Sequence, residues 1–158
     1  MPVVGSGAYA ISHSGEIADA KAYDPKFGTT HVPIVDTAVQ YDCPYTGQSS
    51  VLVIRNALHV PSMHNHLILT FMMREAGGVV NDTPKIQVVD PDVTDHSIFF
   101  GDDKMRIPLF LNGIFSYFPS TKPTAQMIQE CEDIYLLTPS RWDPHNTAYA
   151  HNEEQMSD

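Results

Sequence analysis

The fold class follows from one stretch, Val32-Pro-Ile-Val-Asp-Thr-Ala-Val-Gln-Tyr41, and from the two segments after it. The stretch is rich in β-branched residues and roughly alternates apolar and polar side chains, as a half-buried strand does. The next segment, 42–48, carries the proline and glycine of a loop, and Ser50-Val-Leu-Val-Ile-Arg55 has the composition of a second strand. Together they predict a hairpin with a long loop.

Turn residues divide the rest of the chain into short elements. Twelve prolines and nine glycines among 158 residues leave little room for long helices. We expect one brief helix at 71–76, with Thr70 as its N-cap and Gly77 in the left-handed position after its end. A second helix is expected at 125–131, with Thr124 as its N-cap. Further short strands are expected at 67–69, 78–81 and 86–89, and a last short apolar run lies at 134–137.

The clearest local signal is Arg106-Ile-Pro-Leu-Phe-Leu-Asn112-Gly113-Ile-Phe-Ser-Tyr-Phe118. Asn-Gly between two apolar runs predicts a type I′ hairpin turn, in which both central residues have positive φ. Pro108 has no N–H, so the first strand of this hairpin should be at a sheet edge or bulged. The chain is thus expected to form an all-β (β-dominated) domain, a small barrel or sandwich with one or two short helices.

Charge and composition limit the classes of function. The formal net charge is −10, and the nine Lys and Arg residues are scattered, so nucleic-acid binding is not expected. The apolar runs are too short to span a bilayer, and no secretory leader opens the chain. We therefore expect a cytoplasmic protein with no membrane partner. Cys43 and Cys131 are expected to be free thiols.

Asp36-Thr37-Ala38 follows an apolar run and superficially resembles the aspartic-protease loop. That chemistry needs two carboxylates that share one proton and activate a water. The third residue of such a loop is usually Gly, whereas here Ala38 is followed at once by Val39, which continues the strand. We interpret Asp36 as an acid on the solvent face of a strand, and keep a catalytic Asp36 as the alternative.

Other candidate sites are weaker. His59, His64 and His66 lie close in sequence, but no known zinc-ligand spacing is present, so no metal or other cofactor is expected. The segment Gly5-Ser6-Gly7 lacks the remaining residues of a phosphate loop and is interpreted as a flexible turn. Acidic clusters, interpreted as solvated rather than calcium-binding, lie at Asp90, Asp92, Asp95, Asp102 and Asp103. From chemistry alone, no catalytic, cofactor-binding or metal residue is assigned.

The order of several short segments along the chain resembles that of a known family. The chain runs through the strand and loop of 31–54, then Ala57-Leu-His-Val-Pro-Ser62, Leu67-Ile-Leu-Thr70 and Met73-Arg-Glu-Ala-Gly77, and later Leu137-Thr-Pro-Ser-Arg-Trp-Asp-Pro144. This succession resembles the protease-like region of copia-type retrotransposon Pol polyproteins, roughly over residues 3–144. The resemblance implies a retropepsin-like β domain at 1–144 and leaves 145–158 as a polar tail that we expect to be disordered.

The same resemblance bears on activity. In this family an Asp-Ser/Thr-Gly-Ala-Asp motif is soon followed by two apolar residues and Gly, which Val3-Val4-Gly5 matches. Met1-Pro2 then stands where the end of the aspartate motif would be, so we expect a domain without its Asp-loop strand and without proteolytic activity. Leu67-Ile-Leu-Thr70 departs from the Leu-Leu-Ser pattern of the family.

The family also implies partners. Its members dimerise, each subunit giving one Asp, so a homodimer is one expectation. A second hypothesis is a module that binds other polyprotein segments through exposed aromatic residues. The residues to inspect for such a patch are Phe99, Phe100, Phe115, Tyr117 and Phe118.

Overall fold

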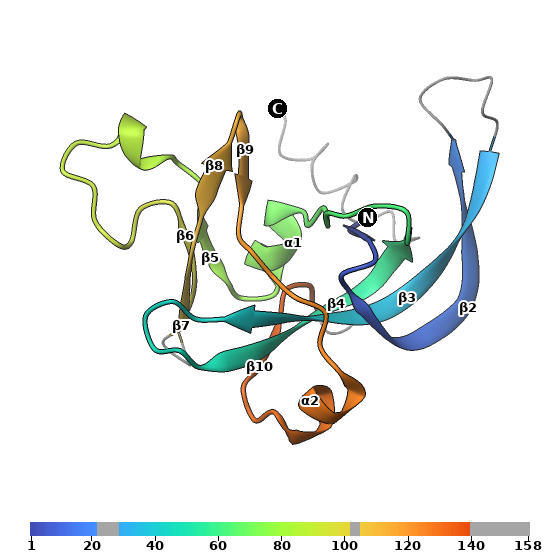
Figure 1. The fold of residues 1–158 in the computed structure, drawn as a ribbon. Helices are drawn as coiled ribbons and strands as arrows, with labels where there is room; N and C mark the ends of the chain where they lie inside the picture. Colours follow the sequence, from blue (N-terminus) through green and yellow to red (C-terminus); the bar gives the residue numbers. More distant parts are fainter. Residues whose placement is uncertain (22–28, 102–104, 140–158) are drawn as a thin grey trace.

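The computed structural model describes residues 1–21, 29–101 and 105–139 and is dominated by β-structure (Figure 1). This confirms the β-dominated fold class. Its elements are β1 (Val3–Val4), β2 (Tyr9–Lys21), β3 (Thr29–Asp42), β4 (Ser49–His59), α1 (Thr70–Glu75), β5 (Val79–Asn81), a 3₁₀ turn (Lys85–Gln87), β6 (Ser97–Phe100), β7 (Met105–Pro108), β8 (Phe110–Asn112), β9 (Phe115–Tyr117), α2 (Ala125–Glu130) and β10 (Ile134–Leu136).

The main sheet has five strands and is built around β4. Its order is β1-β4-β3-β2, and β10 also pairs with β4, in parallel. The hairpin expected at 32–55 is confirmed, because β3 and β4 pair antiparallel with Val39 opposite Leu52. Val39, Leu52 and Ile54 are buried in one cluster, and the alternation seen in the sequence therefore corresponds to a core face.

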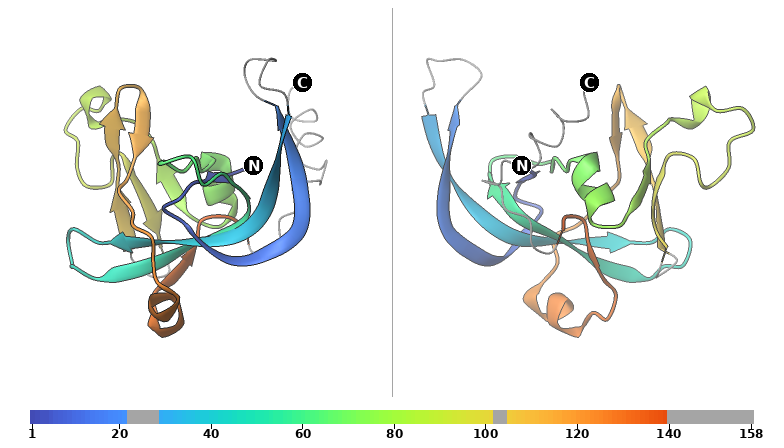
Figure 2. Two further views of the ribbon diagram at one scale, coloured as in Figure 1. Left: turned by 45° about the vertical axis from the view of Figure 1, so that its right-hand side comes forward. Right: turned by 180° about the vertical axis from the view of Figure 1, so that it is seen from behind.

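The longest element pair was not expected from the sequence. β2 and β3 form an antiparallel hairpin of 13 and 14 residues, with register shifts between Ala10 and Ser12 and between His13 and Ile17. Figure 2 shows this hairpin curving away to one side of the molecule, opposite β8 and β9. The segment at 9–21 mixes small, polar and charged residues, so the period-two signal of a strand is weak there.

A smaller three-stranded sheet, β5-β6-β7, joins α1 to the main core. Met73 of α1 packs with Val80, Ile98 and Ile107 in the same cluster as Val39. Pro108 ends β7, which is an edge strand, as the missing N–H predicted. The strand expected at 86–89 is wrong, because the chain forms a 3₁₀ turn at Lys85–Gln87 and the apolar side chains there are exposed.

The Asn-Gly hairpin exists, but its turn is one residue later than expected. Asn112 pairs with Phe115, so the central residues are Gly113 and Ile114. Gly113 has φ +63°, whereas neither Asn112 nor Ile114 has positive φ. This fits the type II′ turn, which takes Gly at its first central position, and not the type I′ turn.

Helix ends match the sequence in part. Thr124 caps α2, since its Oγ1 accepts a hydrogen bond from the N–H of Met127 at 3.1 Å. Thr70 is not a cap, because it is the first residue of α1 and Leu69 holds the N-cap position without a side-chain hydrogen bond. Gly77, after α1, has the expected left-handed φ of +99°.

Two further sequence expectations concern short segments. The strand expected at 67–69 is reduced to a single bridge between Leu67 and Val3. The apolar run at 134–137 contains the strand β10. The tail expected at 145–158 lies outside the described residues. Within the described part of the chain, no helix has the length and apolar character needed to cross a bilayer.

Candidate functional site

Asp36 lies within the paired length of β3 and not in a turn. The register between β3 and β4 shifts between Val35 and Thr37, where Asp36 alone lies opposite two residues of β4, Arg55 and Asn56. The extra residue of this bulge is therefore on β4. On its other edge, β3 pairs Asp36 with Ser12 of β2. Both neighbours along the chain, Val35 and Thr37, are fully buried.

The Asp36 carboxylate is engaged by neighbouring groups. Oδ1 accepts a hydrogen bond from the backbone N–H of Asn56 at 2.9 Å, and Oδ2 accepts one from the hydroxyl of Ser12 at 3.3 Å. The guanidinium of Arg55 lies 3.6 Å from Oδ2. Asn56 has φ +51°, a conformation that few side chains favour. The geometry therefore assigns Asp36 to holding the β4 backbone in this shape.

A second feature is the crossing of the N-terminal segment over the loop after β4. Val3 and Leu67 exchange two backbone hydrogen bonds, of 2.9 and 2.8 Å. The N–H of Gly5 donates to Nδ1 of His66 at 2.9 Å, and the N–H of Ser6 donates to the carbonyl of Met63 at 3.0 Å. Segments sixty residues apart in sequence are thus joined side by side.

Gly5 is required by this crossing. A Cβ at Gly5 would lie 2.2 Å from the carbonyl oxygen of Met63, far inside van der Waals contact, and the obstructing atom is backbone. The Gly5-Ser6-Gly7 segment is therefore a packed turn and not the flexible one that its composition suggested. In the sequence, the signal for this packing is the glycine that directly follows the apolar pair Val3-Val4, because glycine permits a close approach of two backbone segments.

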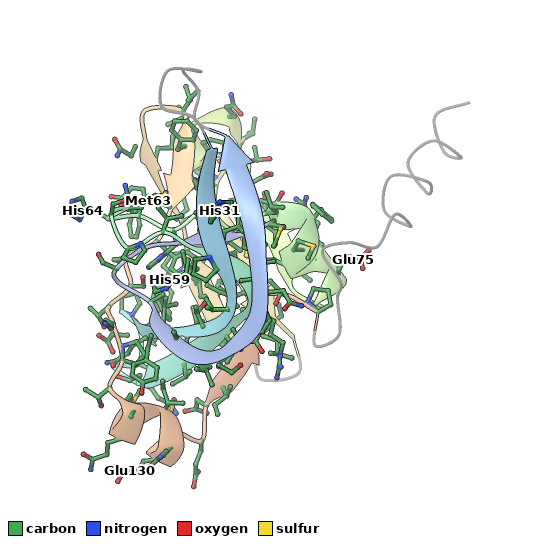
Figure 3. All side chains as sticks on the ribbon, turned by 90° about the vertical axis from the view of Figure 1, so that its right-hand side faces the viewer. His31, His59, Met63, His64, Glu75 and Glu130 are labelled. Carbon is green, nitrogen blue, oxygen red and sulfur yellow. The ribbon has the colours of Figure 1, made fainter. Side chains whose placement is uncertain are left out.

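The three neighbouring histidines do not form a metal site. His66 uses Nδ1 to accept from Gly5, and its partial burial lowers the pKa of its ring. His64 is exposed; Figure 3 shows it beside Met63 on the loop after β4, at the outer edge of the molecule. Throughout the described residues, no group of three or more His, Cys, Asp or Glu side chains is placed to hold a metal ion.

Both cysteines are free thiols, as expected. Cys43 begins the loop between β3 and β4. Burial raises the pKa of its thiol, but hydrogen bonds from the hydroxyl and N–H of Thr46 and from the N–H of Tyr45 outweigh this and leave the pKa lowered. The Cys131 thiol donates to the carbonyls of Ser49 and Asp133 at the end of α2.

The acidic cluster after β5 builds its own turn. Asp92 Oδ1 accepts the N–H of Thr94 at 2.8 Å, and Asp95 Oδ2 accepts the N–H of Asp92 at 3.0 Å. Hydrogen bonds from the hydroxyl of Thr94, the largest cause, and from its N–H lower the pKa of the exposed Asp92 carboxyl. Asp102 and Asp103 lie outside the described residues.

The five aromatic residues singled out from the sequence divide into two groups. Phe100 is buried against Tyr135, Phe99 lies under the guanidinium of Arg106, and Phe118 packs edge-on against Tyr41. Phe115 and Tyr117, in contrast, are exposed on β9. Phe110 of β8 joins them, with its ring centroid 5.8 Å from that of Tyr117. Of these five residues, the exposed ones thus lie on the β8–β9 hairpin, where they form an aromatic surface with Phe110.

Comparison with known proteins adds no relative. No family model matches the chain, no curated protein matches it, and no solved structure matches its fold.

Proposed function

We propose that this chain is a protease-like β domain of a copia-type retrotransposon polyprotein that serves as a binding module and not as a peptidase. The observation that carries the binding role is the exposed aromatic surface of the β8–β9 hairpin, because monomeric proteins rarely leave such surface uncovered without a partner. The occupants that this origin favours are other segments of the same polyprotein or a second copy of the chain.

The crossing of the N-terminal segment supports the family assignment. Val3-Val4-Gly5 and Leu67-Ile-Leu-Thr70 are two of the segments compared with the family, although the second departs from its Leu-Leu-Ser pattern, and the backbone hydrogen bonds between Val3 and Leu67 bring them together. A glycine at position 5 is then a steric requirement. The crossing thus gives the glycine of the apolar-apolar-Gly motif a structural role.

The environment of Asp36 supports the absence of peptidase activity. A catalytic dyad needs carboxylates that face each other across a shared proton and a water. Asp36 instead lies midway along a strand, and its two oxygens accept hydrogen bonds from Asn56 and Ser12. A carboxylate fixed in this way contributes to the fold and is poorly placed to activate water.

A peptidase assay tests this half of the proposal. The purified chain is incubated with a mixture of unstructured peptides at acidic and at neutral pH, with and without pepstatin. We expect no cleavage above that of a preparation carrying Asp36→Asn. Pepstatin-sensitive cleavage that Asp36→Asn abolishes would establish the alternative, an aspartic endopeptidase that uses Asp36.

The genomic DNA around the coding sequence tests the origin. Retrotransposon coding sequence in frame on either side of the chain is expected. An in-frame Asp-Ser/Thr-Gly-Ala-Asp just upstream of Met1 would make the complete protein a protease and overturn the non-catalytic role. Flanking sequence unrelated to any polyprotein would remove the family assignment.

A further inference from the structure

We propose that the aromatic face of the β8–β9 hairpin, formed by Phe110, Phe115 and Tyr117, docks an apolar protein segment that carries Lys or Arg. This inference rests on the binding role proposed above and names the surface and the chemistry of its partner. It follows from the two faces of the hairpin, from the absence of charge on it and from the acidic loop beside it.

The register of the hairpin defines its two faces. Residues directly opposite one another in an antiparallel pair point to the same side. Leu111 and Ser116 therefore share one face, and the Ser116 hydroxyl lies 2.7 Å from Nε2 of the buried His96. That face is turned toward the body of the protein. Phe110 with Tyr117, and Phe115 with Asn112, lie on the other face, which points away from it.

The outer face is unusually apolar for a surface. Phe115 is 70% exposed, and Phe110 and Tyr117 are each 47% exposed. No charged residue occurs anywhere in 107–121. Aromatic side chains of this size can each bury about 150–250 Å², so three of them form a cluster of the kind that dominates binding energy at protein interfaces.

The loop that contacts the opposite face of this hairpin, through His96 and Ser116, is acidic. The chain between β5 and β6 contains four aspartates, Asp82, Asp90, Asp92 and Asp95, and a single lysine, Lys85. It runs alongside the hairpin in both views of Figure 2 and in Figure 1. The N–H of Leu109 donates to the carbonyl of His96 at 2.8 Å, which attaches the end of this loop to the base of the hairpin. A partner that binds the hairpin therefore approaches a part of the protein in which acidic residues outnumber basic ones.

Charge distinguishes the three occupants that could cover the face. A second copy brings another net charge of −10. The chain's own segment 145–158 contains Glu153, Glu154 and Asp158 but no Lys or Arg. Like charges at an interface oppose association, whereas opposite charges steer it and select the partner. A basic, apolar segment from outside this chain, such as another part of the same polyprotein, is the occupant that complements both the rings and the aspartates.

The experiment selects peptides from a random display library on the immobilised full chain. The expected result is enrichment of peptides that combine aliphatic or aromatic residues with Lys or Arg, and weaker retention as salt is raised. Phe115→Ser should reduce the affinity of a selected peptide by about tenfold or more. Asp90→Asn should reduce it less; Asn tolerates the positive φ of Asp90, so the backbone there is preserved.

Two controls distinguish a failure of the proposed aromatic docking face from a failure of the proposed non-catalytic binding function. Tyr45→Ser removes an exposed aromatic residue on the β3–β4 loop and should leave peptide affinity unchanged. Sedimentation of the wild type and of Phe115→Ser measures self-association. A dimer that Phe115→Ser disrupts would replace the basic partner with a second copy. Peptides without basic residues, or peptides that bind Phe115→Ser equally well, would overturn this inference while leaving the absence of peptidase activity intact.

Discussion

Asp36 and Asn56 are joined across the β3–β4 pair by a hydrogen bond of 2.9 Å from the backbone N–H of Asn56 to Oδ1 of Asp36. The donor belongs to the bulge of β4 and has positive φ, whereas the acceptor is the single residue of β3 opposite that bulge. The Asp36 side chain thus stabilises the bulged backbone of β4. The stability of the main sheet should therefore depend on Asp36.

Asp36→Ala is expected to lower the free energy of unfolding by about 1–3 kcal/mol, because it leaves a partly buried N–H without its acceptor. Asp36→Asn can keep an acceptor oxygen for Asn56 and loses only the ion pair with Arg55, so its cost should be smaller. Urea unfolding of both variants measures the difference. Equal stability of wild type and Asp36→Ala would show that the carboxylate has no structural role.

Gly5→Ala is expected to be one of the most destabilising single-methyl changes in the chain. The added Cβ would lie 2.2 Å from the carbonyl oxygen of Met63, and relief requires movement of the backbone. A loss of about 3 kcal/mol or more is expected, as for other severe overpacking. Gly101→Ala is the matched control, since its nearest contact outside its chain neighbours would be an ordinary 3.6 Å from the Phe99 ring. Equal thermal midpoints for the two variants would contradict the close crossing.

His66 should make stability depend on pH. Burial lowers the pKa of His66 in the folded chain below its unfolded value of about 6.5, so the unfolded state takes up a proton first as pH falls. Stability is thus fully present above that pH and declines as pH falls from it toward the folded-state pKa. The lowered pKa of His96, also caused chiefly by burial, acts in the same direction.

The variant His66→Gln should reduce this pH dependence, because glutamine does not titrate and its carbonyl can still accept from Gly5. His64→Gln, at the exposed neighbouring histidine, is the control. The measurement is the free energy of unfolding in urea at neutral and mildly acidic pH. A slope unchanged by His66→Gln would assign the effect to other groups.

Tyr41→Phe is expected to leave the protein as stable or to stabilise it by up to about 1 kcal/mol. The ring of Tyr41 is buried in the core, and among the described residues its hydroxyl has no hydrogen-bond partner. Burial also raises the pKa of Tyr41 to about 12. Tyr117→Phe, on the exposed hairpin, is the control. Destabilisation by Tyr41→Phe above about 1 kcal/mol would reveal a partner for this hydroxyl.

The sequence was most informative where a pattern is local. Apolar alternation predicted the β3–β4 hairpin, and Thr124 predicted the start of α2. It failed at Ile86 and Val89, whose side chains are 86% and 90% exposed although their β-branched character suggested a strand. Among the described residues no strand pairs with this segment, and strand formation depends on pairing as much as on residue preference. β2 was not predicted because its apolar–polar alternation is weak. It forms a strand nevertheless, because it pairs along its length with β3.

The sequence by itself determined the β-dominated class, the positions of most turns and the absence of charge along the β8–β9 hairpin. Only the tertiary structure decided that Gly5 meets Met63, that Asp36 stabilises the backbone at Asn56, and which face of the hairpin points outward. Strand periodicity is a property of neighbouring residues and can be seen along the chain. Contacts between residues twenty to sixty positions apart depend on sheet register, which the finished fold sets.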